Sequence, residues 1–487
     1  MIKRTKIIVT LGPATNSPEI LERIIKAGVD VVRLNFSHGT AQDHIKQAET
    51  VRNRARAVGR QVGVMVDLQG PKIRIGKFLS GKIKLKENDL FCIDTNLDIN
   101  SGDRNSVGCT YKQLSTDLNR GDTLLLDDGR IVLWVRKIAD FAIHCRVKVG
   151  GILSSNKGIN VQGGGLSASS ITEKDKQDIE IAAKLEADYI AVSFVQSDKD
   201  VKKARKLMKK AGWKGCGVIS KIERAEAVEP KIIKKIIQAS DAIMVARGDL
   251  GVEIGDACLP PMQKNLIRKA RYGNIVVITA TQMMESMIKN TMPSRAEVFD
   301  IANAVLDGTD AVMLSGETAV GKHPVAAVEA MVKICTETEK QRTVTKSGHR
   351  IDSKFRRVDE SIAMASMYMA NHFNVKAIAC LTESGSTSLW MSRISSGIPI
   401  FAMAQNVHTR RKVTMYRGVY PVSFFINTKS VSRLNEAVIN ELLRRGVVRV
   451  GDFVVVTKGD FYGVKGGTNT IKIIKVGEHI LDEETLH

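Results

Sequence analysis

The sequence has few of the features that mark membrane proteins and disulfide-bonded proteins. Its seven cysteines are scattered and include no C-x-x-C pair; they are Cys92, Cys109, Cys145, Cys216, Cys258, Cys335 and Cys380. This spacing fits neither a zinc site nor a disulfide framework, so we expect reduced thiols. No run of about 20 apolar residues is present, and we expect no membrane span. The N-terminus lacks the apolar segment of a signal peptide, which predicts a cytoplasmic protein.

Aromatic residues are also scarce, at 5%, whereas 73 lysines and arginines outnumber 52 aspartates and glutamates. The resulting net charge of +21 makes nucleic-acid binding one possible function class. The basic residues, however, gather in helical runs such as 201–212 and are not interleaved with aromatics. We therefore favour a solvated basic surface with sites for small anions, and we expect no nucleic-acid partner.

The 487 residues alternate between short apolar strands and amphipathic helices. Eight strands are predicted, at 6–10, 31–36, 62–68, 189–194, 217–223, 242–248, 275–281 and 311–317. Helix-capping patterns occur at Ser17, 172–175 and 294–297. Eight parallel strands that alternate with helices predict a closed (β/α)₈ TIM barrel, assembled from residues 1–69 and 172–343.

Two further segments have a different character. Residues 70–171 are rich in Gly and Asp and contain alternating apolar stretches typical of antiparallel hairpins. They predict an inserted β-barrel lid domain after the third barrel strand. The α/β pattern resumes after the basic stretch 343–357, with strand candidates at 376–382, 399–404, 420–425, 452–458 and 469–476. These predict a separate C-terminal open α/β domain over residues 357–487.

Polar residues end most of the predicted barrel strands, where barrel enzymes place their active sites. They are Arg33, Asn35, Ser37, Asp67, Lys221, Glu223, Arg247, Asp249, Thr279, Thr281, Ser315 and Glu317. Each alone fits a helix cap or a salt bridge, but together they predict one polar mouth. Glu223 and Asp249 could bind one Mg²⁺ ion. Nearby cations, Arg33, Lys221 and Arg247, would suit a phosphorylated substrate.

Several longer motifs resemble the pyruvate kinase family, in order along nearly the whole chain. They are "VVRLNFSHG" (31–39), "SKIERAEAV" (220–228), "VARGDLGVEIG" (245–255), "ITATQMMESM" (278–287), "SRAEVFDIANAVLDGTDAVMLSGETA" (294–319) and "TNT" (468–470). The stretches "DLQGPKIR" and "SRISSGIPIFAM" are similar to a bacterial group activated by AMP or sugar monophosphates. The resemblance implies Mg²⁺-dependent (or Mn²⁺-dependent) phosphoryl transfer from phosphoenolpyruvate to ADP, which gives pyruvate and ATP in glycolysis. It also implies an allosteric homotetramer.

The resemblance assigns catalytic roles to three residues. It implies that Lys221 stabilises charge on the transferred phosphoryl group, that Arg33 contacts phosphate, and that Thr281 lies on the water route that protonates the enolate. Glu223 and Asp249 would bind the divalent metal. The substrate-binding residues so implied are Arg33, Lys221, Gly248, Asp249 and Thr281.

The same resemblance assigns nucleotide and monovalent-cation sites. Asn35 and His38 would border the nucleotide, and Arg74 and Lys157 would reach its phosphates from the two hinges of a water-excluding lid. The side chains of Asn35, Ser37 and Asp67, with the carbonyl of Leu68, match the family's cage for a monovalent cation, usually K⁺.

Two residues that follow this cage in the sequence differ from those of most K⁺-requiring relatives. Those relatives carry Glu where Lys72 stands and Thr where Ile75 stands. The alternative is an ordinary surface lysine. We predict instead that the Lys72 ammonium substitutes for the monovalent cation, so that K⁺ is dispensable.

The C-terminal loop at 382–388 resembles the family's effector phosphate loop. The residues implied are Thr382, Ser384, Gly385, Ser386 and Thr387, and the alternative is an ordinary strand-to-helix turn. Glu383 stands where relatives regulated by fructose bisphosphate carry Lys, and 460–470 differs from their sugar-binding loop. We therefore expect a monophosphate effector such as AMP or a sugar monophosphate.

Two other functions remain open from the residues themselves. Lys221 could form a Schiff base with a keto acid in a barrel aldolase or lyase, which requires a neutral amine. The positive charge could instead serve nucleic-acid binding without catalysis, which would depend steeply on salt.

Overall fold

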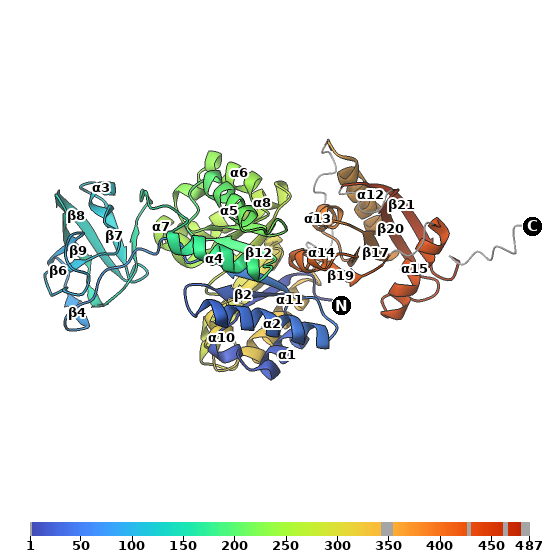
Figure 1. Ribbon diagram of the computed structural model, residues 1–487, viewed down its shortest axis with the longest axis horizontal. Helices are drawn as coiled ribbons and strands as arrows, with labels where there is room; N and C mark the ends of the chain where they lie inside the picture. The colour runs from blue at the N-terminus through green and yellow to red at the C-terminus, as the bar shows by residue number, and fades with distance from the viewer. Residues whose placement is uncertain (1, 342–353, 426–429, 461–465, 479–487) are drawn as a thin grey trace, which may run out of the picture.

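The molecule is built from three folded parts that lie in a row. The computed structural model describes residues 2–341, 354–425, 430–460 and 466–478. An inserted β region lies at one end, a closed barrel in the middle, and a C-terminal α/β region at the other end (Figure 1). Among the described residues, no helix is long and apolar enough to cross a membrane.

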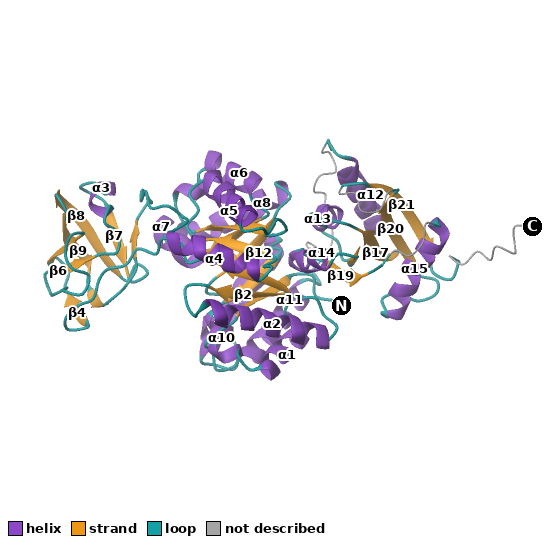
Figure 2. Ribbon diagram, viewed as in Figure 1, coloured by secondary structure: helices purple, strands orange, loops and turns teal. Residues whose placement is uncertain are grey.

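Eight parallel strands close the central barrel, in the spatial order β1-β16-β15-β14-β13-β12-β3-β2. The strands are β1 Lys6–Thr10, β2 Val31–Asn35, β3 Gly63–Asp67, β12 Tyr189–Val192, β13 Gly217–Ile222, β14 Ala242–Ala246, β15 Val276–Ala280 and β16 Ala311–Leu314. They are mostly apolar because helices surround the sheet on the outside and side chains fill its interior (Figure 2). The predicted barrel is confirmed.

Helices connect the barrel strands, and the predicted caps at Ser17, Thr172 and Ser294 each accept a backbone N–H. The helices are α1 Pro18–Ala27, α2 Ala41–Ala57, α4 Glu173–Lys184, α5 Asp198–Lys210, α6 Pro230–Ala239, α7 Arg247–Ile254, α8 Leu259–Tyr272, α9 Arg295–Asp307, α10 Gly316–Ala319 and α11 Pro324–Thr338. Each cap satisfies a free N–H group in the first turn of its helix. The caps therefore fix where α1, α4 and α9 begin.

The inserted region contains a six-stranded sheet, in the order β11-β7-β8-β9-β5-β6, and a two-stranded sheet of β10 and β4. Its elements are β4 Lys82–Leu85, β5 Leu90–Asp94, β6 Ser106–Gly108, α3 Leu114–Asp117, β7 Thr123–Leu126, β8 Ile131–Ala139, β9 Ala142–Val149, β10 Gly151–Ser154 and β11 Ile159–Val161. One apolar core joins both sheets. The two connections to the barrel lie side by side, because Arg74 forms an antiparallel bridge with Gly158.

The C-terminal region is an open sheet in the order β19-β18-β17-β20-β21, with β21 antiparallel to its neighbour. Its elements are α12 Val358–His372, β17 Val375–Leu381, α13 Ser386–Ser392, β18 Ile400–Ala404, α14 Val407–Lys412, β19 Val419–Ser423, α15 Val431–Arg444, β20 Phe453–Gly459 and β21 Thr468–Lys475. Each strand lies within two residues of its prediction, and the predicted α/β fold is confirmed.

Buried charges join the floor of the barrel, at the amino ends of its strands, to the C-terminal region. We call them the floor cluster; its members are Arg4, Lys6, Asp30, Asp310, Glu339 and Arg393. Asp310 accepts a hydrogen bond from Arg393 Nη1 at 2.8 Å, and both side chains are at most 2% exposed. Lys6 Nζ donates to the carbonyl oxygen of Val419 at 2.6 Å. Burial lowers the pKa of Lys6 to about 8, although nearby Asp30 opposes this shift.

Two barrel strands pass into helices within the ranges that the sequence predicted as strand. β14 stops before Arg247, so Arg247 and Asp249 lie in the first turn of α7. β16 ends at Leu314, and Glu317 lies in α10. The chain turns directly into a helix at the rim, so alternate residues there no longer point the same way.

Candidate functional site

A cavity of about 210 Å³ opens at the carboxyl ends of the barrel strands. Most of the predicted site residues converge on it, together with several that the sequence did not single out. Its lining comprises Arg33, Asn35, Ser37, His38, Asp67, Leu68, Gln69, Lys72, Arg74, Ser193, Phe194, Lys221, Glu223, Met244, Ala246, Asp249, Thr281, Met313 and Ser315. We call this the mouth cavity.

Asp67 at the end of β3 is the buried anion of the mouth, with a side chain only 1% exposed. Its carboxylate accepts a hydrogen bond from Arg33 Nε at 2.6 Å and lies 3.4 Å from Lys221 Nζ. Burial alone would raise the pKa of Asp67, but the charges of Lys221 and Arg33 outweigh it and lower that pKa. Asp67 is therefore ionised and already has two cationic partners from the protein.

Lys221 on β13 lies between two carboxylates, since its ammonium is also 2.9 Å from Glu223 Oε1. It donates to Ser193 Oγ at 2.8 Å. Burial works to lower the pKa of Lys221, but Asp67 and Glu223 raise it to about 12. A Schiff-base lysine must lose its proton before it attacks a carbonyl. This environment holds Lys221 as an ammonium ion and disfavours the aldolase alternative.

Glu223 and Asp249 place two carboxylates on the mouth cavity. Glu223 is buried and accepts the backbone N–H of Phe194 at 2.7 Å. Burial and the charge of Asp249 raise the pKa of Glu223, while Lys221 opposes them. No cluster of three or more His, Cys, Asp or Glu with metal-site geometry occurs in the described part of the chain. Two carboxylates beside an open cavity fit Mg²⁺, which commonly takes its other ligands from water and substrate oxygens.

Thr281 has a strained, left-handed backbone (φ 68°), and so has its neighbour Gln282 (φ 53°). The guanidinium of Arg247 holds this turn by donating to the carbonyl oxygens of Thr281 at 2.6 Å and Gln282 at 3.0 Å. Arg247 also pairs with Asp300 at 2.6 Å. The Thr281 hydroxyl accepts the Gly248 N–H at 2.9 Å. Strain maintained in this way is typical of functional positions.

Three residues predicted at the mouth do not line its cavity. Arg247 is buried and serves the turn just described. Thr279 is fully buried and hydrogen-bonds Thr309 at 3.0 Å. Glu317 accepts two backbone N–H groups, one of them from Ser315 at 2.7 Å. Backbone groups thus engage the side chains of Arg247 and Glu317, and the Thr309 hydroxyl engages that of Thr279.

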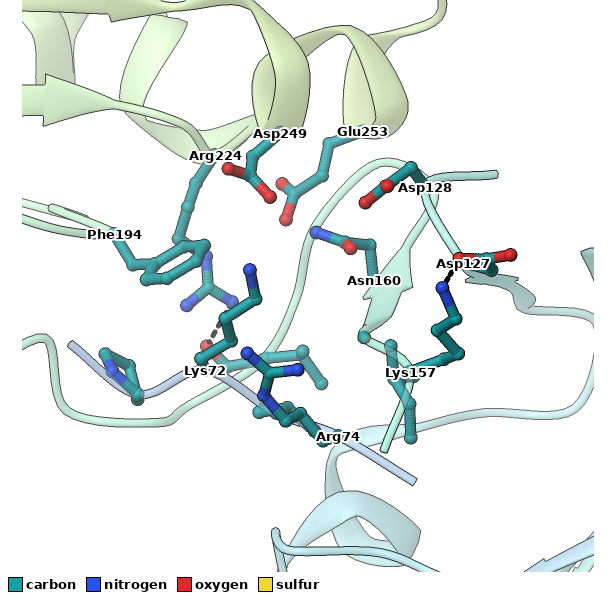
Figure 3. Close-up of a pocket in the computed structure, with 15 residues that line it drawn as sticks. Lys72, Arg74, Asp127, Asp128, Lys157, Asn160, Phe194, Arg224, Asp249 and Glu253 are labelled. Atoms are coloured by element: carbon teal, nitrogen blue, oxygen red, sulfur yellow. Dashed lines mark hydrogen bonds and ion pairs between the residues drawn. The ribbon is translucent and has the colours of Figure 1, made fainter. Parts of the chain in front are cut away.

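A second cavity, of about 150 Å³, lies between the inserted region and α7 (Figure 3). Lys72 and Arg74 reach it from the outgoing connection and Lys157 from the returning one. Arg74 donates to the carbonyl oxygen of Asn156 at 2.8 Å, and Lys157 pairs with Asp127 at 2.7 Å. Lys72 is exposed, and within the described ranges its ammonium has no hydrogen bond or ion pair (Figure 3). We call this the hinge cavity.

Ile75, which differs from most K⁺-requiring relatives together with Lys72, lies outside both cavities. Its side chain is fully buried in the core of the inserted region, and it forms a backbone bridge with Cys109. Ile75 lines neither the mouth cavity nor the hinge cavity. It therefore packs the inserted region and does not contact the charged site.

The four predicted cage residues, Asn35, Ser37, Asp67 and Leu68, all line the mouth cavity. The carbonyl oxygen of Leu68 accepts the hydroxyl of Ser193 at 2.7 Å. Asn35 and His38 also line a neighbouring cavity of about 710 Å³ between the loop after β1 and helix α2. The predicted nucleotide residues are thus divided among three adjoining cavities.

The predicted effector residues lie where β17 passes into α13. Gly385 has φ 82° and donates its N–H to the hydroxyl of Thr382 at 2.9 Å. Ser384 and Ser386 are joined by a hydrogen bond of 3.1 Å. Thr387 is buried, and its hydroxyl bonds that of Thr468. Residues 461–465 of the loop over 460–470 lie outside the described residues.

Sequence reasoning missed Ser193 and Phe194, which connect Leu68, Lys221 and Glu223. Ser193 lies near the end of the strand predicted at 189–194, so the strand-end signal that identified other site residues also applies to it. Phe194 has a left-handed backbone (φ 53°), which directs its N–H to Glu223. No residue type in the local sequence indicates that conformation.

Comparisons with known proteins agree with this geometry. Residues 2–328 match the family model "Pyruvate kinase, barrel domain", and residues 360–474 match "Pyruvate kinase, alpha/beta domain". The chain is 53% identical to a pyruvate kinase of Buchnera aphidicola subsp. Baizongia pistaciae, over 97% of this chain and 99% of the relative. It is 52% identical to pyruvate kinase II of Salmonella typhimurium, over 98% and 99% of the two chains. The chain therefore belongs to the pyruvate kinase family, the enzymes that transfer a phosphoryl group from phosphoenolpyruvate to ADP to give pyruvate and ATP.

Proposed function

We propose that Lys221 and Arg33 provide the positive charge for phosphoryl transfer in this enzyme. The single observation that supports this is the position of Lys221, a buried ammonium between Asp67 and Glu223 at the mouth cavity. A cation that is already fixed in a buried site stabilises developing phosphoryl charge without reorganisation. Glu223 and Asp249 would hold the Mg²⁺ ion, which would supply positive charge to neutralise phosphoryl and substrate oxygens.

The proton for the second half-reaction comes from the Thr281 side of the cavity. A β-phosphate oxygen of ADP forms the new bond to phosphorus, the bond from phosphorus to the enol oxygen breaks, and an enolate remains. Lys221 has a pKa of about 12 and keeps its proton, so it is a poor donor to that enolate. The Thr281 hydroxyl accepts the Gly248 N–H, which supports a role for it in orienting a donor water and, with Asp249, the substrate carboxylate.

Hydrogen exchange at the methyl group of pyruvate separates the two steps. We expect Thr281→Ala to slow both this exchange and overall turnover, and Lys221→Met to abolish phosphoryl transfer but retain exchange. Thr336→Ala, on the outer helix α11, is the matched control. Normal exchange in Thr281→Ala would contradict the assignment.

We further propose that turnover does not require K⁺. Asp67 already has two protein cations, and the Lys72 ammonium lines the same cavity without an observed partner among the described residues. A covalently attached ammonium on a flexible stem can supply the charge that a monovalent ion would bring.

A potassium titration in tetramethylammonium buffer tests this proposal. Wild-type turnover should persist without K⁺, and Lys72→Glu should create a requirement for it. Lys77→Glu, an exposed neighbour in the inserted region, is the control for added negative charge. Turnover of the wild type that collapses without K⁺ would refute the proposal.

For the C-terminal region we propose allosteric activation by a phosphomonoester such as AMP or a sugar monophosphate. The hydroxyls of Thr382, Ser384 and Ser386 and the left-handed Gly385 support a phosphate site at the start of α13. The carboxylate of Glu383 disfavours a second phosphate. At subsaturating phosphoenolpyruvate, AMP or a sugar monophosphate should activate the enzyme. Activation by fructose 1,6-bisphosphate alone would contradict this proposal.

We also propose a homotetramer in the cytoplasm that binds no nucleic acid, with domains at 1–69 and 172–343, 70–171, and 357–487. Exposed apolar side chains near α9 support self-association, since Met292 is 74% and Phe299 70% exposed. Light scattering of the purified protein, with Phe299→Ser as the interface variant, tests the assembly.

A further inference from the structure

The connection that returns from the inserted region to the barrel is hydrogen-bonded to two acidic residues, Glu253 and Glu226. Gly163 donates its N–H to the backbone oxygen of Glu253 at 3.0 Å, and the Gly165 N–H donates to the Glu226 carboxylate. Residues 163, 164 and 165 have φ values of 85°, 84° and 105°, which glycine tolerates and other residues rarely adopt. A Cβ at Gly164 would lie 2.5 Å from the Glu226 carboxylate. The connection therefore fits closely against the barrel.

The Glu253 side chain adds a contact just before these glycines, at strand β11. It is 3% exposed, and its carboxylate accepts the Ala225 N–H at 2.8 Å. The side-chain amide of Asn160, on β11, points toward this carboxylate across the hinge cavity (Figure 3). Glu253 thus joins its own helix α7, the loop after β13 and the returning strand β11. The metal-binding candidate Asp249 lies one turn earlier on the same helix.

Both positively and negatively charged groups surround Glu253. Burial raises the pKa of Glu253 to about 7, opposed by the Ala225 N–H and the Arg224 charge. The other charged groups that line the hinge cavity are Lys72, Arg74, Asp127, Asp128, Lys157 and Asp249. Both the acid and the carboxylate have an oxygen that can accept the Ala225 N–H. The hydrogen bond from the Ala225 N–H to Glu253 can therefore form whether or not Glu253 is ionised.

We infer that Glu253 is a positioning residue for the nucleotide end of the site. By holding β11 against α7 it fixes the preceding hinge residue Lys157, which faces the same cavity. The inference rests on the nucleotide-phosphate role that the family resemblance implies for Lys157. It assigns to α7 two tasks, one at the metal through Asp249 and one at the hinge through Glu253.

Steady-state kinetics and amide exchange test the inference on the full-length enzyme. In Glu253→Ala we expect the KM for ADP to rise about tenfold, the effect of losing one buried hydrogen-bonding group, with kcat and the KM for phosphoenolpyruvate little changed. Glu253→Gln, which keeps one acceptor oxygen, should restore part of the affinity. Amide exchange at Gly163 and Gly165 should be faster in the ligand-free Glu253→Ala protein. Glu180→Ala, exposed on α4, should change neither measurement.

Two further variants separate this inference from the nucleotide assignment. Asn160→Ala should shift the KM for ADP in the same direction without altering α7, and it serves if Glu253→Ala does not fold. Lys157→Ala tests the nucleotide role itself. If Lys157→Ala raises the KM for ADP while folded Glu253→Ala does not, the positioning role is wrong and the nucleotide role stands. If Lys157→Ala leaves the KM for ADP unchanged, the nucleotide role of Lys157 is wrong, and the positioning role of Glu253 is overturned with it. Unchanged exchange at both glycines in Glu253→Ala also overturns the inference.

Discussion

The two ends of the barrel both bury charged side chains, but they differ in what faces those charges. At the mouth, Asp67, Lys221 and Glu223 border an open cavity. At the floor, Arg393 and Asp310 are enclosed against the C-terminal region. The residue types are alike, so buried charge alone does not identify an active site. Access for a ligand makes the difference, in agreement with the general placement of barrel active sites at the carboxyl ends of strands.

The largest effect should come from removing the central cation of the mouth. We expect Lys221→Met to lower kcat about 10³-fold or more, because a fixed charge beside the transferred group is lost. A coupled assay of pyruvate formation measures this, and circular dichroism checks that the variant is folded. A folded variant with near-normal kcat would contradict the catalytic role of the charges at the mouth, and with it the functional difference between the mouth and the floor of the barrel.

At the floor we expect a loss of stability in place of a loss of catalysis. Arg393→Met leaves Asp310 buried without its cation, which should lower the unfolding free energy by about 3–5 kcal/mol. Urea unfolding measures the change, while kcat of the folded variant stays near the wild-type value. Arg445→Met, which breaks a partly exposed pair with Glu441 on α15, should cost only about 0–1 kcal/mol. Similar losses in both variants would contradict the role of burial.

The floor should also respond to alkaline pH through Lys6. Its folded pKa of about 8 lies below the ordinary value of 10.5, so the unfolded chain binds more protons between those values. Stability of the wild type relative to Lys6→Met should therefore rise with pH through that window, by about 1–3 kcal/mol. Unfolding free energies of both proteins across this range measure the difference. A flat or falling difference would show that Lys6 stays charged in the folded state.

The smallest effect should come from a residue that touches the mouth but not its substrate. Thr10 accepts from Arg33 Nη1 at 3.0 Å and donates to the Leu314 carbonyl oxygen at 2.9 Å. Thr10→Val should cost about 1 kcal/mol of stability and should raise the KM for phosphoenolpyruvate only slightly. Thermal unfolding and initial rates measure both quantities. A loss of kcat comparable with that of Lys221→Met would give Thr10 a direct catalytic role.

Much of the fold could be predicted from the sequence, because periodicity and strand length are local properties. The position of Asp67, Lys221 and Glu223 at one mouth followed from the geometry of parallel strands. The same reasoning was wrong for Arg247 and Glu317, because the chain enters a helix at the rim and their side chains bind backbone groups that are mainly distant in the sequence. These contacts depend on tertiary structure, and the local pattern does not contain them.

The bridge between Arg74 and Gly158 also has a consequence for folding. Strand β3 ends at Asp67 and its barrel neighbour β12 begins at Tyr189, so a long segment separates two strands that must pair. Closing a longer flexible loop costs more chain entropy. If the inserted region folds first, the bridge between Arg74 and Gly158 brings the two ends of that segment together. The loop that the barrel then has to close is shorter.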